Sequence, residues 1–177
     1  MCKKFFFLCK YLALKVRYGK ALCTQSIPKF SGSSKVNITK GKIKIGKHFF
    51  ANDHVYMAAV DNGVITFGNN CFINRNCIFA CKKQINIGNN VAFGPNVIVY
   101  DHDHSFGYNG INKAIYKCTD IVIEDNCWIG AGVTILRGTH IGAGSVIGAG
   151  CVVKGEIPAH SLVTSDRALI IKEIQEN

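Results

Sequence analysis

The chain has 177 residues, of which 48% are apolar, and this length and composition suit one domain with a sizeable core. Its formal net charge is +10, from 21 Lys and Arg against 11 Asp and Glu, which favours anionic partners. The sequence contains no recognisable nucleic-acid-binding motif, so among such partners we expect no nucleic acid.

Nine cysteines raise the question of a disulfide or metal framework, but their spacing matches neither pattern. The number is odd, and no CxxC pair occurs. Four of them (Cys71, Cys77, Cys127 and Cys151) occupy small-residue positions of a repeat, where a thiol packs as a small apolar group. We therefore expect reduced thiols, a cytoplasmic location and no bound metal.

Residues 1–27 alternate apolar clusters with lysine and arginine, which predicts a short basic amphipathic helix. Such a helix can cap one end of the fold, or residues 1–20 can make a peripheral contact with the anionic inner face of the cell membrane. Lysines interrupt every apolar run of transmembrane length. The segment also lacks the apolar core and the cleavage site of a signal peptide.

Residues 28–39 are rich in turn formers and predict a connection that precedes four related segments. These segments begin at Ile45, Phe67, Ile87 and Ile123, so that their starts lie 22, 20 and 36 residues apart. Their similarity indicates one structural unit that recurs with insertions of different length.

Residues 123–153 repeat every six residues, with a small residue four places after each aliphatic one. The aliphatic residues are Ile123, Ile129, Ile135, Ile141, Ile147 and Val153, and the small ones are Cys127, Val133, Thr139, Ser145 and Cys151. A period of six fits neither a helix nor a single strand, and it predicts short strands separated by turns. Three hexads close one triangular coil of 18 residues, and stacked coils bury an aliphatic column that one coil cannot bury. The repeat predicts an all-β fold, a triangular prism of parallel strands.

An 18-residue coil gives each insertion a definite position. Four extra residues fall near residues 61–63, two fall near Lys82 and Lys83, and 18 fall between Tyr100 and Thr119. The long insertion, residues 101–119, is the only polar, aromatic and histidine-bearing departure from the repeat. Loops on a rigid scaffold often carry function, so we place the candidate active site there.

The repeat, with WIGAGVTI at residues 128–135 and VIGAGCVV at residues 146–153, resembles the hexapeptide-repeat acyltransferases. The resemblance covers about residues 42–171 and implies a left-handed parallel β-helix with one long protruding loop. The segments PNV (95–97), DHDH (101–104) and WIG (128–130) are similar to the branch of galactoside, maltose and capsule or lipopolysaccharide O-acetyltransferases. That branch implies acetyl transfer from acetyl-CoA to a sugar hydroxyl.

Two histidines, His104 and His102, are candidates for the general base. Counted without gaps forward from Pro95 and backward from Trp128, the base of the family falls on His104, whereas His102 needs a shift of two residues. Imidazole suits the role because its ordinary pKa of about 6.5 lets it accept a hydroxyl proton at neutral pH. The resemblance implies that the acetyl group passes directly from acetyl-CoA to the hydroxyl. The second histidine would then anchor the loop.

The resemblance also implies binding residues. For the acceptor these are Asn74, Asp101, Asp103 and Trp128, where either aspartate can instead orient the imidazole. For acetyl-CoA they are Trp128, Gly130, Ala131, Gly132, Ala149 and Gly150, because the pantetheine arm must lie close to the backbone, with Lys154 and Arg167 near the phosphates.

We expect three parts: an N-terminal amphipathic helical segment (1–27), a β-helix acyltransferase domain (28–171) with loop 101–119 inserted, and a C-terminal tail (172–177). The usual Gly-Asn-Pro-Ala-Lys end of the family is replaced by SDRAL at residues 165–169, which puts adenosine recognition in question. Three flat faces and a loop that borders a neighbour's groove favour a homotrimer.

Several alternatives to sugar O-acetylation stay open. They are N-acetylation of a nucleotide-linked aminosugar, acetylation of a xenobiotic, and a non-enzymatic scaffold role. A zinc enzyme on the same fold is not expected, because the histidines lack the spacing for three ligands.

Overall fold

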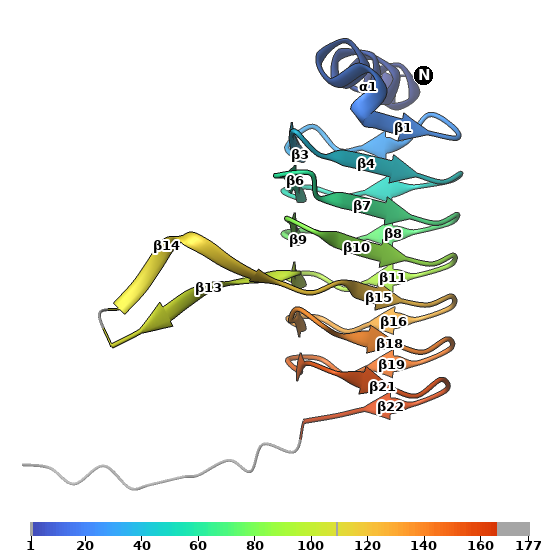
Figure 1. The fold of residues 1–177 in the computed structure, drawn as a ribbon. Coiled ribbons are helices and arrows are strands. Elements are labelled where there is room, and N and C mark those ends of the chain that lie inside the picture. Colours follow the sequence, from blue (N-terminus) through green and yellow to red (C-terminus); the bar gives the residue numbers. More distant parts are fainter. Residues whose placement is uncertain (1, 109, 166–177) are drawn as a thin grey trace, which may run out of the picture.

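The computed structural model describes residues 2–108 and 110–165, which form a solenoid of three parallel sheets with a helix at the N-terminal end (Figure 1). The chain begins with α1 (Cys2–Tyr18) and η1 (Gly19–Ala21). It then visits sheets A, B and C in turn in every coil. In Figure 1 the strands of sheet A run to the right across the front while the chain descends and returns behind them, so the coil is left-handed.

Sheet A contains β1 (Leu22–Thr24), β4 (Lys42–Ile45), β7 (Val64–Phe67), β10 (Gln84–Ile87), β15 (Ile121–Ile123), β18 (His140–Ile141) and β21 (Glu156–Ile157). Sheet B contains β2 (Lys29–Phe30), β5 (Phe50–Ala51), β8 (Phe72–Ile73), β11 (Ala92–Phe93), β16 (Trp128–Ile129), β19 (Val146–Ile147) and β22 (Leu162–Val163). Sheet C contains β3 (Lys35–Thr39), β6 (Tyr56–Val60), β9 (Ile78–Cys81), β12 (Ile98–Tyr100), β17 (Thr134–Ile135) and β20 (Val152–Val153).

The strand register confirms the predicted insertions. On sheet A, Ile43 lies opposite Ile65, Ile65 opposite Ile85, and Ile85 opposite Ile121, which gives the expected intervals of 22, 20 and 36 residues. The interval from Ile123 to its partner is then 18 residues. All the extra residues lie at one corner of the prism, between sheets C and A, because every insertion follows a sheet C strand.

The core confirms the predicted aliphatic column and adds a second feature. The repeating isoleucines and the small residues after them are buried. In the first four coils phenylalanine rings join the buried isoleucines, and the centroids of neighbouring rings lie 5.0–5.6 Å apart. The rings, in order of contact, are Phe30, Phe49, Phe67, Phe79 and Phe93. Such close aromatic contacts stabilise the wider coils beyond simple area burial.

The N-terminal segment differs from the predicted boundary. Strand β1 begins at Leu22 and pairs with β4, so the first coil starts inside the predicted helical segment 1–27. Residues 28–39, expected to be a connection, supply β2 and β3 of that coil. Leu22 and Phe30 are fully buried in the core, and this burial stabilises the first coil. The turn-rich composition of the segment does not reveal it.

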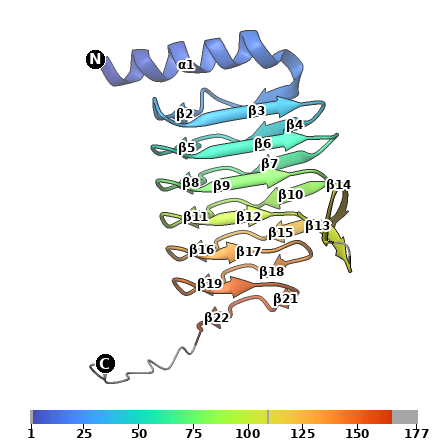
Figure 2. The same ribbon diagram turned by 90° about the vertical axis from the view of Figure 1, so that its left-hand side faces the viewer.

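Helix α1 lies across the end of the prism (Figure 2). Leu14 and Tyr18 pack against the core, and the Tyr18 hydroxyl donates to Val36 O at 2.7 Å. Lys10 Nζ donates to the carbonyl oxygens of Gly32 at 2.9 Å and of Ser34 at 2.7 Å. These bonds satisfy acceptors of the first coil, so α1 caps the solenoid.

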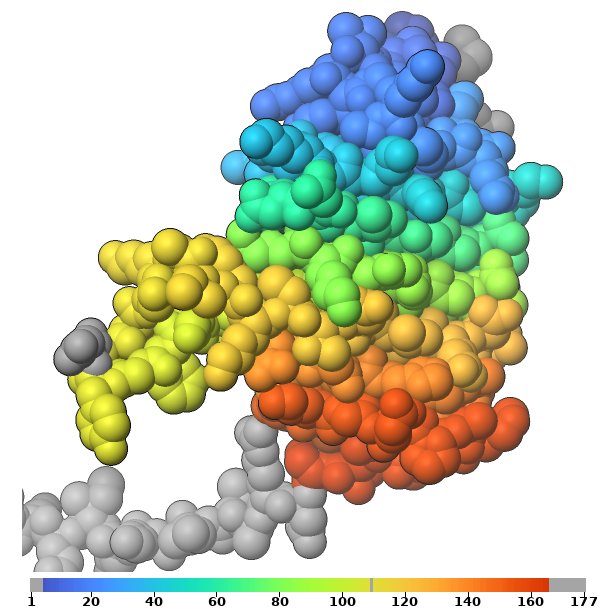
Figure 3. Space-filling view, in the orientation of Figure 1, coloured from blue at the N-terminus to red at the C-terminus, as the bar shows by residue number. Residues whose placement is uncertain are grey.

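The long insertion is an antiparallel hairpin of β13 (His102–Gly107) and β14 (Gly110–Cys118). It projects from the body at the corner between sheets C and A (Figure 3). Of the nine cysteines, the eight whose side chains are described are free.

Candidate active site

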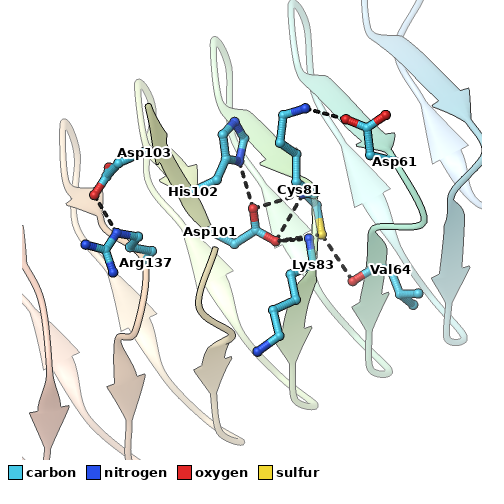
Figure 4. A network of polar contacts seen from close by, with 9 residues as sticks. Asp61, Val64, Cys81, Lys83, Asp101, His102, Asp103 and Arg137 are labelled. Carbon is cyan, nitrogen blue, oxygen red and sulfur yellow. Dashed lines mark hydrogen bonds and ion pairs between the residues drawn. The ribbon is translucent and has the colours of Figure 1, made fainter. Parts of the chain in front are cut away.

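The base of the hairpin is organised by one buried carboxylate. Asp101 is fully buried and accepts hydrogen bonds from the backbone N–H groups of Lys82 at 2.9 Å and Lys83 at 2.7 Å (Figure 4). Cys81 Sγ donates to it at 3.1 Å, and the Nδ1 atom of His102 lies 2.8 Å away. The carboxylate therefore holds the His102 ring and leaves Nε2 directed away from Asp101.

Two opposing effects act on the pKa of Asp101. Burial alone raises the pKa, but hydrogen bonds from His102, from the Lys82 and Lys83 amides and from Cys81 outweigh burial and lower it. Asp101 is therefore an anion at neutral pH. Because Asp101 is fully buried, neither of its carboxylate oxygens can reach a substrate. The expected contact between Asp101 and the acceptor is therefore wrong, and the residue instead positions His102.

His104 has a different environment from His102. It is exposed, and its ring packs on Tyr116 with 4.5 Å between centroids. Lys82 Nζ lies 3.9 Å from the centre of the same tyrosine ring. The side chain of His102 is only 16% exposed and contacts the edge of Tyr116. Tyr116 thus fixes both imidazoles on one face of the hairpin, His102 toward the body and His104 toward solvent.

Asp103 points to the other side of the hairpin. Its carboxylate accepts a hydrogen bond from Arg137 Nε at 2.5 Å, and Arg137 also donates to Thr119 Oγ1 at 3.3 Å (Figure 4). Arg137 belongs to the next coil, so this pair ties the hairpin stem to the solenoid. Sequence reasoning did not single out Arg137, because its partner follows from coil stacking.

The predicted cofactor residues lie elsewhere in the chain. Residues 130–132 and 149–150 stack at the corner between sheets B and C, where Gly150 N donates to Ala131 O at 2.8 Å. Asn74 lies at the same corner two coils earlier. Trp128 projects from sheet B and is 58% exposed.

Lys154 follows β20 and lies instead at the hairpin corner, between sheets C and A. Arg167 lies outside the described residues. The predicted cofactor set is therefore divided between two corners of one chain.

A single chain does not bring the two halves of the predicted site together. The histidines lie at the corner between sheets C and A, whereas Asn74 and the glycine corner lie at the far edge of sheet C. From Asn96 to Asp101 the chain crosses this sheet in five extended residues, about 16 Å. The distance is too large for one acceptor hydroxyl and one thioester to meet all these groups.

The outer surfaces of the three sheets differ in polarity. Sheet A exposes mainly polar side chains, including Lys42, Lys44, Gln84, Asn86, His140 and Glu156. Sheet B carries an outward apolar column of Phe50, Phe72, Ala92, Trp128, Val146 and Leu162. Sheet C carries Tyr56, Ile78, Ile98 and Val152. Two of the three faces are therefore suited to contact another protein surface.

A histidine on sheet A predicts a pH effect on stability. His140 Nε2 lies 2.8 Å from Glu124 Oε1 and His140 Nδ1 lies 2.9 Å from Glu156 Oε2, so both ring nitrogens donate when the ring is protonated. The hydrogen bond to Glu124, aided by the charges of both glutamates, raises the pKa of His140 above 6.5. This contribution to stability is complete below the unfolded-state pKa and is lost as the pH rises through the folded-state pKa.

We expect the urea midpoint of the wild type to fall, relative to that of His140→Gln, as the pH rises from about 6 to about 9. The change will be small, because the side chains of the pair are more than one-third exposed and solvent screens them. Parallel urea titrations of the two proteins measure it. A constant difference between the midpoints across this range would contradict the assignment.

Comparison with known proteins agrees with this architecture. A sequence profile of the bacterial transferase hexapeptide family (six repeats) matches residues 120–155. A Schizosaccharomyces pombe protein named as an acetyltransferase is 43% identical over 111 residues, which are 63% of this chain and 54% of that protein. The chain therefore spans about half the length of that relative.

Two solved structures share both fold and sequence. A maltose O-acetyltransferase from Clostridium difficile 630 is 32% identical, with a TM-score of 0.53 and coverage of 83% of this chain and 71% of that one. A hexapeptide-repeat acetyltransferase from Vibrio cholerae O1, solved with acetyl coenzyme A, is 28% identical, with a TM-score of 0.54 and coverage of 96% and 79%. The hexad repeat, the left-handed solenoid and these matches agree, and the chain therefore belongs to the hexapeptide-repeat acyltransferase family.

Proposed function

We propose that the protein is an acetyl-CoA-dependent O-acetyltransferase that acts on a sugar hydroxyl in the synthesis of a surface glycan. The observation that carries this proposal is the single histidine-bearing hairpin inserted into a regular hexapeptide solenoid, with His102 and His104 held on one face and Asp101 buried beneath. Relatives named as acetyltransferases support the same activity. We place the reaction in the cytoplasm, where cysteines stay reduced.

In the proposed reaction, His104 is the general base. It takes the proton from the acceptor hydroxyl while the oxygen attacks the thioester carbonyl, so that a C–O bond forms and the C–S bond to CoA breaks. A backbone N–H stabilises the oxyanion that develops, and the CoA sulfur leaves as a thiol once it has received the proton. His102, fixed by Asp101, keeps the hairpin stem and the Tyr116 ring in place.

The glycine corner fits the pantetheine arm of acetyl-CoA. Gly132 and Gly150 have φ values of +67° and +73°, and a Cβ at Gly150 would meet no other atom within 4 Å. The corner therefore carries no side chain larger than the methyl groups of Ala131 and Ala149 over two coils, so a narrow chain can approach its backbone closely. Trp128, on the adjoining face, would flank the thioester end.

We further propose a homotrimer in which the hairpin of one copy reaches the sheet B face of the next. The two apolar faces, B and C, would meet in a repeated head-to-tail contact that closes after three copies, while polar sheet A faces solvent. The hairpin itself exposes Phe106, Ile111 and Ile115. An isolated two-stranded hairpin is marginally stable in water, so a neighbouring copy is the natural support.

The direct test is release of free CoA thiol from acetyl-CoA in the presence of a panel of bacterial glycans, simple sugars and aminosugars. We expect acceptor-dependent turnover with at least one hydroxyl acceptor and a product that hydroxylamine cleaves as an ester. An amide product from an aminosugar would identify N-acetylation instead. Absence of turnover with the whole panel, together with no binding of acetyl-CoA in calorimetry, would favour a scaffold role.

A further inference from the structure

The positive charge of the protein is confined to one end of the chain. Residues 1–50 contain 12 Lys and Arg and no Asp or Glu, whereas residues 51–177 contain nine Lys and Arg against 11 Asp and Glu. The first acidic residue is Asp53. The excess of +10 therefore arises entirely from the N-terminal 50 residues.

In the structure, residues 2–50 form α1, the first coil and the sheet A strand of the second coil, the blue end of the prism in Figure 3. Most of the cationic side chains there are exposed, namely Arg17, Lys20, Lys29, Lys35, Lys40, Lys42, Lys44 and Lys47. Lys10 and Lys15 donate to backbone carbonyls of the first coil, so they support the cap. The exposed cations lie on all three sheets, with Lys29 on sheet B, Lys35 on sheet C and Lys42 on sheet A, so positive charge surrounds this end of the solenoid.

Helix α1 at this end has two apolar faces. Its inner face packs on the prism through Leu14 and Tyr18, which contact the core, and through Phe7, whose ring contacts Phe50 of the second coil. Its opposite face, at spacings of three and four residues, carries an exposed stripe of Phe5, Cys9, Leu12 and Val16. Val16 is 89% exposed and Phe5 is 70% exposed. A helix that only capped the solenoid would have a polar outer face, so this stripe lacks a partner in the chain described.

We propose that this end of the protein docks on an anionic phospholipid surface, with α1 lying in the interfacial plane. The apolar stripe would enter the boundary between headgroups and acyl chains, and the surrounding lysines would contact the lipid phosphates. Charge selects this occupant over a second copy of the chain, because two such ends brought together would repel. No helix in the described part of the chain meets the criteria for a membrane span.

This docking role is independent of acetyl transfer. The hairpin follows the fourth strand of sheet C, so four coils separate its histidines from α1. At the usual spacing between neighbouring strands this distance is about 15–20 Å. In the proposed homotrimer, three parallel chains place three copies of α1 at the same end, which multiplies a weak lipid affinity.

The test is sedimentation of the full-length protein with vesicles of phosphatidylcholine alone or mixed with phosphatidylglycerol. We expect binding to the mixed vesicles only, and weaker binding when NaCl is raised from about 0.1 M to about 1 M, because screening shortens the reach of the charges. Equal recovery on neutral and anionic vesicles, or binding to neither, would overturn the proposal.

Two pairs of variants separate the apolar and the charged contributions. Leu12→Ser/Val16→Ser should weaken vesicle binding at least tenfold, whereas Val122→Ser, a change of an outward apolar side chain on sheet A away from α1, should leave it unchanged. Lys42→Gln/Lys44→Gln should weaken binding about tenfold, whereas Lys113→Gln/Lys117→Gln on the hairpin should not.

The same samples distinguish this proposal from the enzymatic one. The two N-terminal variants should transfer acetyl groups to a soluble acceptor at the wild-type rate in the absence of vesicles. If a variant and its control lose vesicle binding equally, the place of the substitution on the protein does not matter. That result would overturn docking through α1. A change in particle mass for Leu12→Ser/Val16→Ser without vesicles would identify end-to-end association instead and would also overturn it.

Discussion

His104→Ala is expected to lower kcat by about 10²- to 10⁴-fold, the usual contribution of a positioned general base. The exposed ring of His104 on Tyr116 can reach an acceptor from outside the chain, whereas His102 is largely covered and bonded to Asp101. Affinity for acetyl-CoA and the thermal midpoint should change little, because the residue buries no part of the core. Steady-state kinetics with the acceptor found in the glycan panel measure the effect.

Two control variants test the division of roles between the histidines. His102→Ala and Asp101→Asn should reduce kcat less than His104→Ala, and they should lower the thermal midpoint because they disturb a buried carboxylate with four donors. An inactive His102→Ala beside an active His104→Ala would exchange the roles, and full activity in both would remove the histidine mechanism.

The second large effect concerns assembly. Light scattering is expected to give a particle of about 58 kDa, three times the chain mass of 19.4 kDa. Phe106→Ser/Ile111→Ser should dissociate the particle, because these side chains lie opposite each other on the hairpin and are largely exposed. Activity should fall about 10²-fold in parallel, since the histidines would lose the neighbour's groove.

The matched control for assembly is Gln84→Ala, a change of an outward side chain on polar sheet A. This variant should keep both the mass and the activity of the wild type. If the wild-type protein is a monomer at the concentration of the assay and is fully active, the proposal that two copies of the chain form each site is refuted.

The repeating unit and the place of each departure from it can be read from the residues in order. Isoleucines such as Ile129 and Ile135, six residues apart, specify strand and turn locally, because each hexad must bury one aliphatic side chain and close one corner. The intervals between related segments then located the hairpin before any contact was known. Both features depend on neighbours along the chain, which is why they are readable from sequence.

The tertiary structure decided what depends on contacts between coils. The sequence did not indicate that Leu22 begins the first coil, since only its pairing with Ile43 makes it a strand residue. It also left open which aspartate meets which histidine. Asp101 is held by the backbone N–H groups of Lys82 and Lys83, one coil earlier. The sequence predicted that an insertion lies at these two lysines, but it did not predict the direction in which their N–H groups point.

The division of the candidate site between two corners was likewise decided by the tertiary structure. The family resemblance placed His104, Asn74 and Gly130 in one predicted site, and it did so without stating which copy of the chain supplies each residue. Their separation within one chain follows from the three-sheet path, since residues less than one coil apart lie on different faces. The homotrimer expected from the sequence would bring the two corners together, and the structure adds the reason: within one chain the full width of sheet C separates them.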